Sequence, residues 1–374
     1  MAINVQAAVF HGPGRPLTIE TLQLDPPQSG EVMVRIVATG LCHTDLHIME
    51  GHQPQAVPAV LGHESAGVIV AVGPDVTGLD IGDHVVPFML PECAVCPNCL
   101  SGRTNICLKV KERTSPASSR LHWQGRPVHT FAGMGTFADH MVITADRVAK
   151  VSKAARFDGA CYASCGGATG IGTVRHMGVD ADSLVVVFGL GGIGLNMVQS
   201  ARQLGAKTII GIDTNDAKEA VARRMGATHF INPARQDSVP AAIMAITGMG
   251  ATHSFECVGS PSVMRQAVDA TNPFYGRCTL VGVAAAGAEL SLPIQGLSMG
   301  KTVGGLLMGG LKPRSQLPGL VQEYAEGRLN FDALISHRLP LDLINEGFAL
   351  MKRGEVLRAV ILFDGTIRNS AGPQ

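Results

Sequence analysis

Four of the nine cysteines in this 374-residue chain fall within fifteen residues, at Cys93, Cys96, Cys99 and Cys107. Two overlapping Cys-x-x-Cys units followed by a fourth cysteine can surround one tetrahedral zinc ion with thiolates. In a reducing compartment such a cluster binds metal more often than it forms disulfides. Four thiolates fill the coordination sphere, so this zinc would hold the loop of residues 92–108 and leave no position for a substrate. The cluster therefore predicts a structural zinc site.

A glycine-rich sequence, Gly-Leu-Gly-Gly-Ile-Gly, follows an apolar run and opens a helical pattern. Glycines at these spacings permit a tight turn, a close approach of the backbone to a pyrophosphate and close packing of helix on strand. The N-terminus of the following helix offers free N–H groups and partial positive charge to phosphates. The alternative is a glycine-rich turn without a ligand. We assign a dinucleotide site to Gly189, Gly191, Gly192, Ile193 and Gly194.

An acidic residue, Asp213, closes the next predicted strand 19 residues beyond Gly194. Its carboxylate can accept hydrogen bonds from the adenosine ribose hydroxyls and would repel a 2′-phosphate, so NAD is favoured over NADP. Lys218 can contact the same ribose. The alternative for Asp213 is a helix cap. The complete strand, turn, helix and acid favour the cofactor interpretation.

The elements that would position these residues differ along the chain. Over the first 150 residues, short strands at 31–38, 65–72 and 84–86 alternate with turns, which predicts an antiparallel, barrel-like region; the first of them has the period of a half-buried strand. From Asp182 on, apolar strands alternate with helical runs, which predicts a doubly wound parallel sheet and an α/β fold. The predicted strands are 184–188, 208–212, 229–231, 254–258 and 278–283, and the predicted helices are 195–204, 217–225, 263–270, 318–326 and 343–351. A last strand is expected at 358–363, where the tail rejoins the first region.

Composition excludes several classes of function. The 30 basic residues equal the 30 acidic ones, so nothing indicates binding to nucleic acid or to an anionic membrane. No apolar stretch approaches the roughly 20 residues that cross a bilayer. The first residues have no charged lead and no long apolar core, so we expect no signal peptide and a cytoplasmic protein.

Three further segments contain potential metal ligands, although a lone cysteine or histidine is usually a structural residue. They are Cys-His-Thr-Asp at 42–45, Gly-His-Glu at 62–64 and Cys-Gly-Gly-Ala-Thr-Gly at 165–170. With the four-cysteine lobe and the glycine motif, they resemble the medium-chain zinc-dependent alcohol dehydrogenases over essentially the whole chain. The segments 111–135 and 255–259 fit the subgroup of animal alcohol dehydrogenases and thiol-dependent formaldehyde dehydrogenases. The resemblance implies a GroES-like catalytic domain at 1–166 and 308–374 and a Rossmann NAD domain at 167–307.

The resemblance also implies roles for single residues. Cys42, His63 and Cys165 would hold a catalytic zinc with one open position. Glu64 lies behind that metal in the family, and Asp45 would fix the His63 imidazole. Thr44 would take the alcohol proton, which in the family then passes through the nicotinamide ribose to His47 and on to solvent. His47 can also be an ordinary surface histidine. Further cofactor contacts would come from His43, Thr169, Val258, Val281, Val283 and Arg358, the last of which can instead be an ordinary surface charge.

The substrate is less well specified. The resemblance places Met89, Phe131, Ala132, Val283 and Leu307 around the substrate channel and Lys111 near its mouth, with core packing as the alternative for each. Because this set is apolar apart from Lys111, we expect a hydrophobic primary alcohol that is oxidised to the aldehyde, with two zinc ions and NAD as cofactors. An S-hydroxymethyl thiol adduct ranks second, because residues 51–56 lack the acidic pair of the glutathione-dependent enzymes and Lys111 replaces their arginine.

Two further hypotheses remain. One is a nicotinoprotein that keeps its nicotinamide bound, and the other is a zinc-containing interaction module fused to a nucleotide sensor. The resemblance also predicts a homodimer, paired through residues 289–307, with a homotetramer as the alternative. Cys161, Cys257 and Cys278 are expected to be buried core residues.

Overall fold

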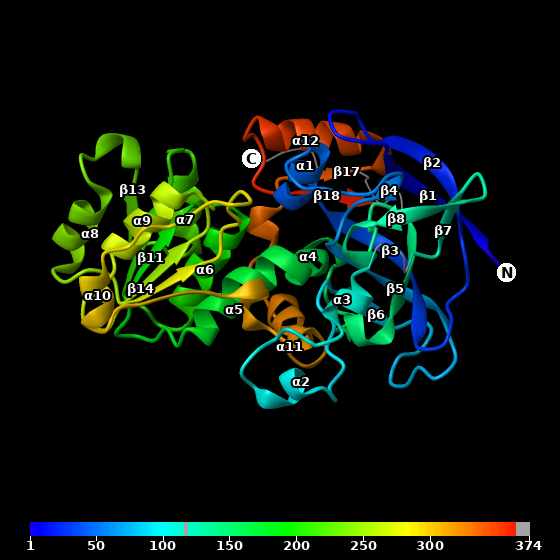
Figure 1. Cartoon of the computed structure of the whole chain (residues 1–374), viewed down its shortest axis with the longest axis horizontal. Coiled ribbons are helices and arrows are strands. Elements are labelled where there is room, and N and C mark those ends of the chain that lie inside the picture. The colour runs from blue at the N-terminus through cyan, green and yellow to red at the C-terminus, as the bar shows by residue number, and fades with distance from the viewer. Residues whose placement is uncertain (116–118, 364–374) are drawn as a thin grey trace. The chain divides into compact units, whose positions relative to one another are not determined.

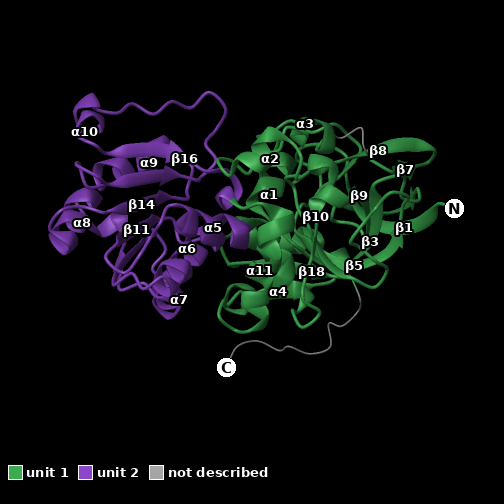
Figure 2. Ribbon diagram, turned by 90° about the horizontal axis from the view of Figure 1, so that it is seen from below, with its two compact units in different colours: residues 1–165, 311–374 green, residues 166–310 purple. Residues whose placement is uncertain are grey.

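The computed structural model describes residues 1–115 and 119–363, which form two compact units (Figures 1 and 2). Unit 1 combines residues 1–165 with the chain from 311 onwards, and unit 2 comprises residues 166–310. The division made from the sequence, at residues 166 and 308, is close to these limits. Residues 116–118 of the predicted insertion and 364–374 of the predicted tail lie outside the described residues.

A small closed barrel forms one part of unit 1. Its strands follow the order β1-β2-β7-β8-β4. The longest pairing joins β1 to β2 in antiparallel register, and β4 pairs with β8 in parallel. Large apolar side chains fill the core around the barrel, among them Phe10, Leu22, Phe137 and Phe348. The strands are β1 (Ile3–Phe10), β2 (Thr18–Leu24), β4 (Ala59–Val60), β7 (Leu121–Trp123) and β8 (Arg126–Thr130).

The larger sheet of unit 1 has seven strands in the order β10-β6-β5-β3-β18-β17, with β9 paired to β3. The tail strand β18 pairs with β3 and so returns the end of the chain to the first region. The antiparallel pairing predicted for the first 150 residues is wrong at one place, where β4 runs parallel to β8. Later in the chain, β17 also runs parallel to β18. The strands are β3 (Glu31–Gly40), β5 (Ser65–Val72), β6 (His84–Pro87), β9 (His140–Thr144), β10 (Val148–Lys150), β17 (His337–Leu339) and β18 (Ala359–Leu362).

Strand β3 differs from its predicted burial. The alternation at 31–38 predicts one exposed face, but nine of its ten residues are buried. The strand pairs with β5, β9 and β18, and helix α4 packs against it. The helices of unit 1 are α1 (His43–Met49), α2 (Pro97–Ser101), α3 (Val110–Arg113), α4 (Phe157–Tyr162), α11 (Pro313–Ala325) and α12 (Ile344–Lys352). Helices α1, α2 and α3 lie in the region where only strands and turns were expected, whereas α11 and α12 overlap the helices predicted at 318–326 and 343–351.

Unit 2 is a six-stranded parallel sheet in the order β13-β12-β11-β14-β15-β16, which agrees with the predicted doubly wound sheet. The central strand β11 is a continuous apolar run that is buried at four of its five positions. The strands are β11 (Leu184–Phe188), β12 (Thr208–Ile212), β13 (His229–Ile231), β14 (His253–Glu256), β15 (Arg277–Leu280) and β16 (Thr302–Gly305). The helices are α5 (Ala168–His176), α6 (Gly192–Gln203), α7 (Lys218–Met225), α8 (Val239–Thr247), α9 (Pro261–Asp269) and α10 (Ile294–Ser298).

Candidate metal and cofactor sites

Three distant segments of unit 1 bring four potential metal ligands together. One donor atom from each of Cys42, His63, Glu64 and Cys165 lies within 4.8 Å of the others. The imidazole and Glu64 carboxylate are buried, while the two cysteines are only partly exposed. Two thiols and one imidazole match the donor set of a catalytic zinc with an open position. The family resemblance implied these same three ligands, and the geometry allows them to hold one ion.

Local backbone features place each ligand. Cys42 is the residue before α1, with an extended backbone, so its side chain lies at the start of that helix. Cys165 lies in a wide helical turn, residues 163–167, between α4 and α5. His63 follows Gly62, whose φ of 88° favours glycine. A Cβ at Gly62 would lie 2.5 Å from the Phe137 ring, so this position also has no room for a side chain.

The Asp45 carboxylate lies on the far side of the imidazole. Its Oδ2 is 3.2 Å from Nδ1 of His63, and its Oδ1 accepts a hydrogen bond from the Gly62 backbone N–H at 2.9 Å. Asp45 therefore holds both the ring and the backbone next to it, which leaves Nε2 of His63 for a metal. Burial lowers the pKa of His63, but the Asp45 carboxylate and the neighbouring Cys42 raise it well above its usual value.

The Glu64 carboxylate is buried behind the cluster. Its Oε1 lies 4.0 Å from Nε2 of His63, and its Oε2 pairs with the guanidinium of Arg358. Burial raises the pKa of Glu64 to about 7, although Arg358 acts in the opposite direction. The Arg358 guanidinium in turn lies 4.6 Å from the centre of the Tyr162 ring. Arg358 is 6% exposed, so it is not an ordinary surface charge.

The two cysteines of this cluster interact directly. A hydrogen bond from Cys165 holds the pKa of the Cys42 thiol well below its usual range, and the neighbouring His63 adds to the effect. A sulfur that is readily deprotonated suits a metal ligand, because the thiolate is the form that coordinates. The donor set and its burial therefore fit zinc.

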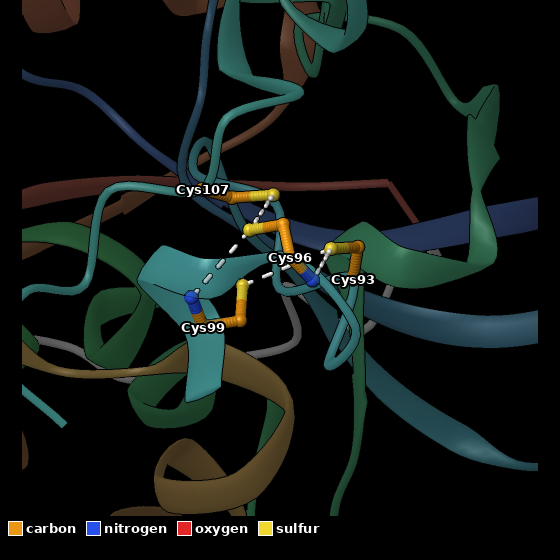
Figure 3. Close-up of side chains that lie close together, drawn as sticks. All are labelled: Cys93, Cys96, Cys99 and Cys107. Atoms are coloured by element: carbon orange, nitrogen blue, oxygen red, sulfur yellow. Dashed lines mark hydrogen bonds between the residues drawn. The ribbon is translucent and has the colours of Figure 1, made fainter. Parts of the chain in front are cut away.

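The four-cysteine lobe has the geometry of a closed tetrahedral site (Figure 3). The Sγ atoms of Cys93 and Cys99 are 3.9 Å apart, as are those of Cys96 and Cys107. Four sulfurs at about 2.3 Å from one zinc would be separated by about 3.8 Å, whereas a disulfide needs about 2.05 Å. Backbone N–H groups of Leu108 and Cys99 lower the pKa of Cys96 to about 6, which favours its thiolate. The residues fit a structural zinc.

Helix α11 anchors this lobe from within unit 1. The Glu92 carboxylate accepts hydrogen bonds from the backbone N–H and hydroxyl of Ser315, at 3.0 and 2.8 Å, in the first turn of α11. Arg314 also donates to the Glu92 carbonyl at 3.3 Å. The apolar side chains of the lobe contribute little, since Val95 and Leu100 are exposed. The remaining stability of the loop must therefore come largely from the metal.

The glycine motif of unit 2 joins β11 to α6. Gly189 has a φ of 89°, and a Cβ at Gly194 would overlap the Gly189 carbonyl oxygen. A Cβ at Gly191 would meet nothing within 4 Å, so the backbone there is open to a ligand. Gly192 and Ile193 then begin the 12-residue helix α6. The start of a helix carries partial positive charge next to this open backbone, which suits the pyrophosphate of NAD.

Asp213 lies at the end of β12, beside this loop. Its Oδ2 accepts hydrogen bonds from the Leu190 backbone N–H and from Nζ of Lys218, both at 2.9 Å, and its Oδ1 accepts one from Asn215 N–H at 3.0 Å. The carboxylate is therefore fixed in place next to the glycine turn. This position fits recognition of a ribose diol and disfavours a 2′-phosphate.

A buried acid that the sequence analysis did not single out supports the same loop. Oε1 of Glu256 accepts backbone N–H groups from Val258 and Gly259, both at 2.8 Å. Burial raises the pKa of Glu256, although these bonds lower it. The turn that it holds packs against the motif, because a Cβ at Gly189 would touch Val258. The signal in the sequence is a glutamate at the end of a strand, followed three residues later by glycine.

The other predicted site residues are distributed between the units. In unit 1, the Phe131 ring meets the His63 ring edge-on at 5.4 Å, and Thr44 Oγ1 lies 3.7 Å from Cys42 Sγ. Met89 packs against a hydrophobic cluster, and Lys111 is exposed on α3. His43 begins α1 and His47 lies in its last turn. In unit 2, Thr169 on α5 lies beside Met308, Val281 N–H bonds to the Glu256 carbonyl, and Val258, Val283 and Leu307 are exposed.

Arg147 is a second buried residue that the sequence analysis did not identify. Its guanidinium is almost fully buried and donates to the carbonyls of Arg113, Ala132 and Gly133 at 2.6 to 3.0 Å. Ala132 has a φ of 51°, so this arginine fixes a strained turn beside Phe131. Burial lowers the pKa of Arg147 to about 10, which still leaves it charged. No local pattern marks it, since all its partners are backbone atoms of distant residues.

One expectation about the remaining cysteines is wrong. Cys161 and Cys278 are buried as predicted, but Cys257 is partly exposed, because it follows β14 in the turn that Glu256 holds.

Among residues 1–115 and 119–363, no helix combines the length and apolar character that a bilayer crossing requires.

Comparison with known proteins places this fold and these sites in a family. The alcohol dehydrogenase GroES-like domain matches residues 28–153, and the zinc-binding dehydrogenase domain matches residues 192–326. The S-(hydroxymethyl)glutathione dehydrogenase of Paracoccus denitrificans is 42% identical, over 96% of this chain and all of the relative. The class-3 alcohol dehydrogenase of Cereibacter sphaeroides is also 42% identical with the same coverage.

Solved structures give the same result. An alcohol dehydrogenase zinc-binding domain protein from Burkholderia ambifaria aligns with a TM-score of 0.91 and 35% identity, over 97% of this chain and all of that one. The benzyl alcohol dehydrogenase of Acinetobacter calcoaceticus aligns with a TM-score of 0.89 and 33% identity, over 96% and 99% of the two chains. The chain belongs to the medium-chain zinc-dependent alcohol dehydrogenase family. It is an NAD-dependent zinc oxidoreductase with a small-molecule alcohol or aldehyde as substrate.

Proposed function

We propose that this enzyme oxidises the hydroxymethyl group of a thiol–formaldehyde adduct to the thioformate ester. The balanced reaction converts R–S–CH₂OH and NAD⁺ into R–S–CHO, NADH and a proton. Its relatives carry the main support, since several named S-(hydroxymethyl)glutathione dehydrogenase are 40–42% identical over 95–96% of this chain. The second candidate substrate is a hydrophobic primary alcohol.

In the proposed site, Cys42, His63 and Cys165 hold the catalytic zinc, and the four-cysteine lobe holds the structural one. When bound, zinc supplies a Lewis acid that lowers the pKa of a hydroxyl group, and NAD supplies the hydride acceptor. The Asp45 carboxylate keeps Nε2 of His63 directed at the metal. The Arg358 guanidinium pairs with the Glu64 carboxylate and so keeps that carboxylate away from the open coordination position of the zinc.

Protons leave through side chains of α1 in this proposal. Thr44, whose Oγ1 is 3.7 Å from Cys42 Sγ, accepts the substrate hydroxyl proton as its own proton passes on. His47, one turn further along the helix, takes the proton to solvent, since its side chain is partly exposed. Asp213 and the turn at Gly189–Gly194 bind the cofactor, with NAD preferred to NADP.

The identity of the thiol follows less directly from the relatives. Residues 51–56 contain no acidic residue, and Lys111 lies exposed on α3 where the resemblance implies an arginine. A lysine keeps the positive charge but has no bidentate fork for a carboxylate. We therefore propose that the adduct of a thiol other than glutathione is used at least as well as the glutathione adduct.

A specific observation favours the second candidate. Phe131 packs on the His63 ring, and Met89 is likewise apolar, as the sequence-based substrate set requires. The structural neighbour from Acinetobacter calcoaceticus is named benzyl alcohol dehydrogenase. A hydrophobic alcohol would need no thiol, so the two candidates predict different requirements.

Formaldehyde oxidation with and without thiols separates them. NADH formation is followed with formaldehyde alone, with formaldehyde plus glutathione, cysteine or another small thiol, and with benzyl alcohol. Turnover that appears only when a thiol is present supports the adduct. Efficient oxidation of benzyl alcohol with no effect of any thiol on formaldehyde would overturn it in favour of the second candidate.

We further propose a cytoplasmic homodimer. Strand β16 is at the edge of the six-stranded sheet and is largely exposed, and it lies in the predicted pairing segment 289–307. An exposed edge strand can pair with its counterpart in a second copy. Light scattering on the purified protein tests this, with a mass of two chains expected; one of four chains would favour the homotetramer.

A further inference from the structure

A second group of metal ligands lies at the other end of α1. Donor atoms of His47, Glu50 and His52 all lie within 4.8 Å of one another. The two Nδ1 atoms of the histidines are 3.3 Å apart, and Oε2 of Glu50 is 3.8 Å from Nδ1 of His52. None of these atoms belongs to the catalytic cluster or the cysteine lobe. We infer that His47, Glu50 and His52 form a third, exchangeable zinc site.

The backbone brings these side chains together by a helix-ending motif. The His52 N–H donates to the His47 carbonyl at 2.8 Å and the Gly51 N–H to the Ile48 carbonyl at 3.0 Å. Gly51 has a φ of 84°, so the two bonds form the pattern in which a left-handed glycine ends a helix. The chain therefore folds His52 back onto the last turn of α1. Its ring lies 5.5 Å from the ring of His47.

The distances suit a tetrahedral ion. Two imidazole nitrogens at about 2.0–2.1 Å from zinc at the tetrahedral angle are separated by about 3.3 Å. Nδ1 of His47 and Nδ1 of His52 already have this separation. The carboxylate needs only a small side-chain movement, and a water molecule would complete the site. The partial negative charge at the end of α1 also favours a cation there.

Lys352 moderates the affinity of this site. Its Nζ pairs with Oε1 of Glu50 at 2.8 Å, and it holds the pKa of that carboxyl below its usual value. The ammonium charge opposes a nearby metal ion, while Oε2 of Glu50 stays available. Three protein ligands with a neighbouring positive charge make a weaker site than the two resident ones, so its zinc exchanges with solution.

The site would control turnover as well as bind metal. In the proposed function His47 carries the reaction's proton to solvent, and a zinc ion on its Nδ1 would block one of the two ring nitrogens that such a relay uses to accept and release a proton. Zinc in excess of the resident ions would therefore inhibit the enzyme. This inhibition rests on the proposed function, whereas the binding of a third zinc does not.

Equilibrium dialysis of the purified enzyme against zinc chloride tests the site. Wild type is expected to bind one zinc ion per chain beyond the resident ions. His52→Gln should weaken that ion by at least about tenfold, since even loss of an outer-shell partner costs 10–100-fold. Lys352→Met should strengthen it. His229→Gln, an exposed histidine in unit 2, is the control and should bind as wild type does.

Two results would overturn the inference. One is a wild-type enzyme that binds no zinc beyond its resident ions throughout the titration. The other is His52→Gln binding the additional zinc as tightly as wild type. Zinc inhibition of NADH formation is measured in parallel and should be relieved in His52→Gln. If the additional zinc binds but does not inhibit, the proposed role of His47 fails while the metal site stands.

Discussion

Asp45 and His63 form a buried pair in which Nδ1 of the imidazole lies 3.2 Å from a carboxylate oxygen, while the other oxygen accepts the Gly62 N–H. One carboxylate thus sets both the ring and the backbone turn that carries it. Asp45→Asn should lower zinc affinity at the catalytic site by about 10–100-fold, as loss of such outer partners typically does. Zinc release to a chelator and kcat are the measurements. Asp237→Asn, at an exposed position, is the control, and equal zinc retention in both variants would contradict the role.

Removal of a cysteine from the lobe should act on stability first. Cys96→Ser is expected to lose one zinc per chain and to unfold at lower temperature, because the exposed apolar residues of the lobe cannot hold it. Each kcal/mol lost should lower Tm by roughly 2–4 °C. Metal analysis and thermal unfolding measure this. Cys257→Ser, outside both clusters, is the comparison, and a lobe variant with unchanged Tm would refute the structural assignment.

Asp213 should set the preference between the two dinucleotides. Asp213→Asn removes the charge that faces the ribose while keeping the shape of the side chain. The ratio of kcat/KM with NADP to that with NAD is expected to rise about tenfold or more, because repulsion of the 2′-phosphate is lost. Asp182→Asn, which is exposed and remote from the motif, should leave the ratio unchanged. If the ratio of kcat/KM values were unaltered in Asp213→Asn, the adenosine ribose of the cofactor would not bind beside Asp213.

Asp158 should contribute a pH-dependent part of the stability. Burial raises the pKa of its carboxyl, but hydrogen bonds from Arg156 at 2.6 Å and Arg338 at 2.7 Å outweigh this and hold it below the usual value. A folded-state pKa below the unfolded one stabilises the protein above the unfolded pKa, and the stabilisation is lost as pH falls through the folded value.

The Asp158→Asn variant measures that contribution. At pH 7 it should lower the free energy of unfolding by about 1–3 kcal/mol, as expected for hydrogen bonds to a charged group. The difference from wild type should shrink as the pH is lowered below about 4, where the unfolded carboxyl protonates. Denaturant unfolding of both proteins across this range is the measurement. A difference that grows on acidification would show that Asp158 is not held in its charged form.

The sequence predicted some elements to the residue and others poorly. Strands β5, β11, β12 and β13 have the predicted limits, because polar or glycine residues bound their apolar runs. The burial of β3 could not be predicted from its alternation, since α4 and the tail strand β18 come from distant parts of the chain to cover it. The short helices α1, α2 and α3 were missed for lack of a periodic apolar face.

The candidate sites likewise divide into those that local sequence predicts and those that depend on distant segments. The cysteine lobe and the glycine motif are local patterns, so their residues could be named from spacing. The joining of Cys42, His63 and Cys165 required the family resemblance, because long stretches of chain separate them. Arg147 and the Glu64–Arg358 pair were not predictable as interactions, since their partners are distant in the sequence or are backbone atoms. The pair of His47 and His52 depends on the left-handed conformation of Gly51. Glycine permits this conformation, but the sequence alone does not predict it.

The zinc content and turnover of Cys42→Ala test the central claim most directly. The variant, purified without added zinc, is compared with wild type for metal per chain and for NADH formation with the best substrate. We predict one zinc ion fewer per chain, turnover reduced to background, and a Tm well above that of Cys96→Ser. Full zinc content, or one zinc fewer with wild-type turnover, would contradict the assignment of Cys42, His63 and Cys165 as the catalytic metal site.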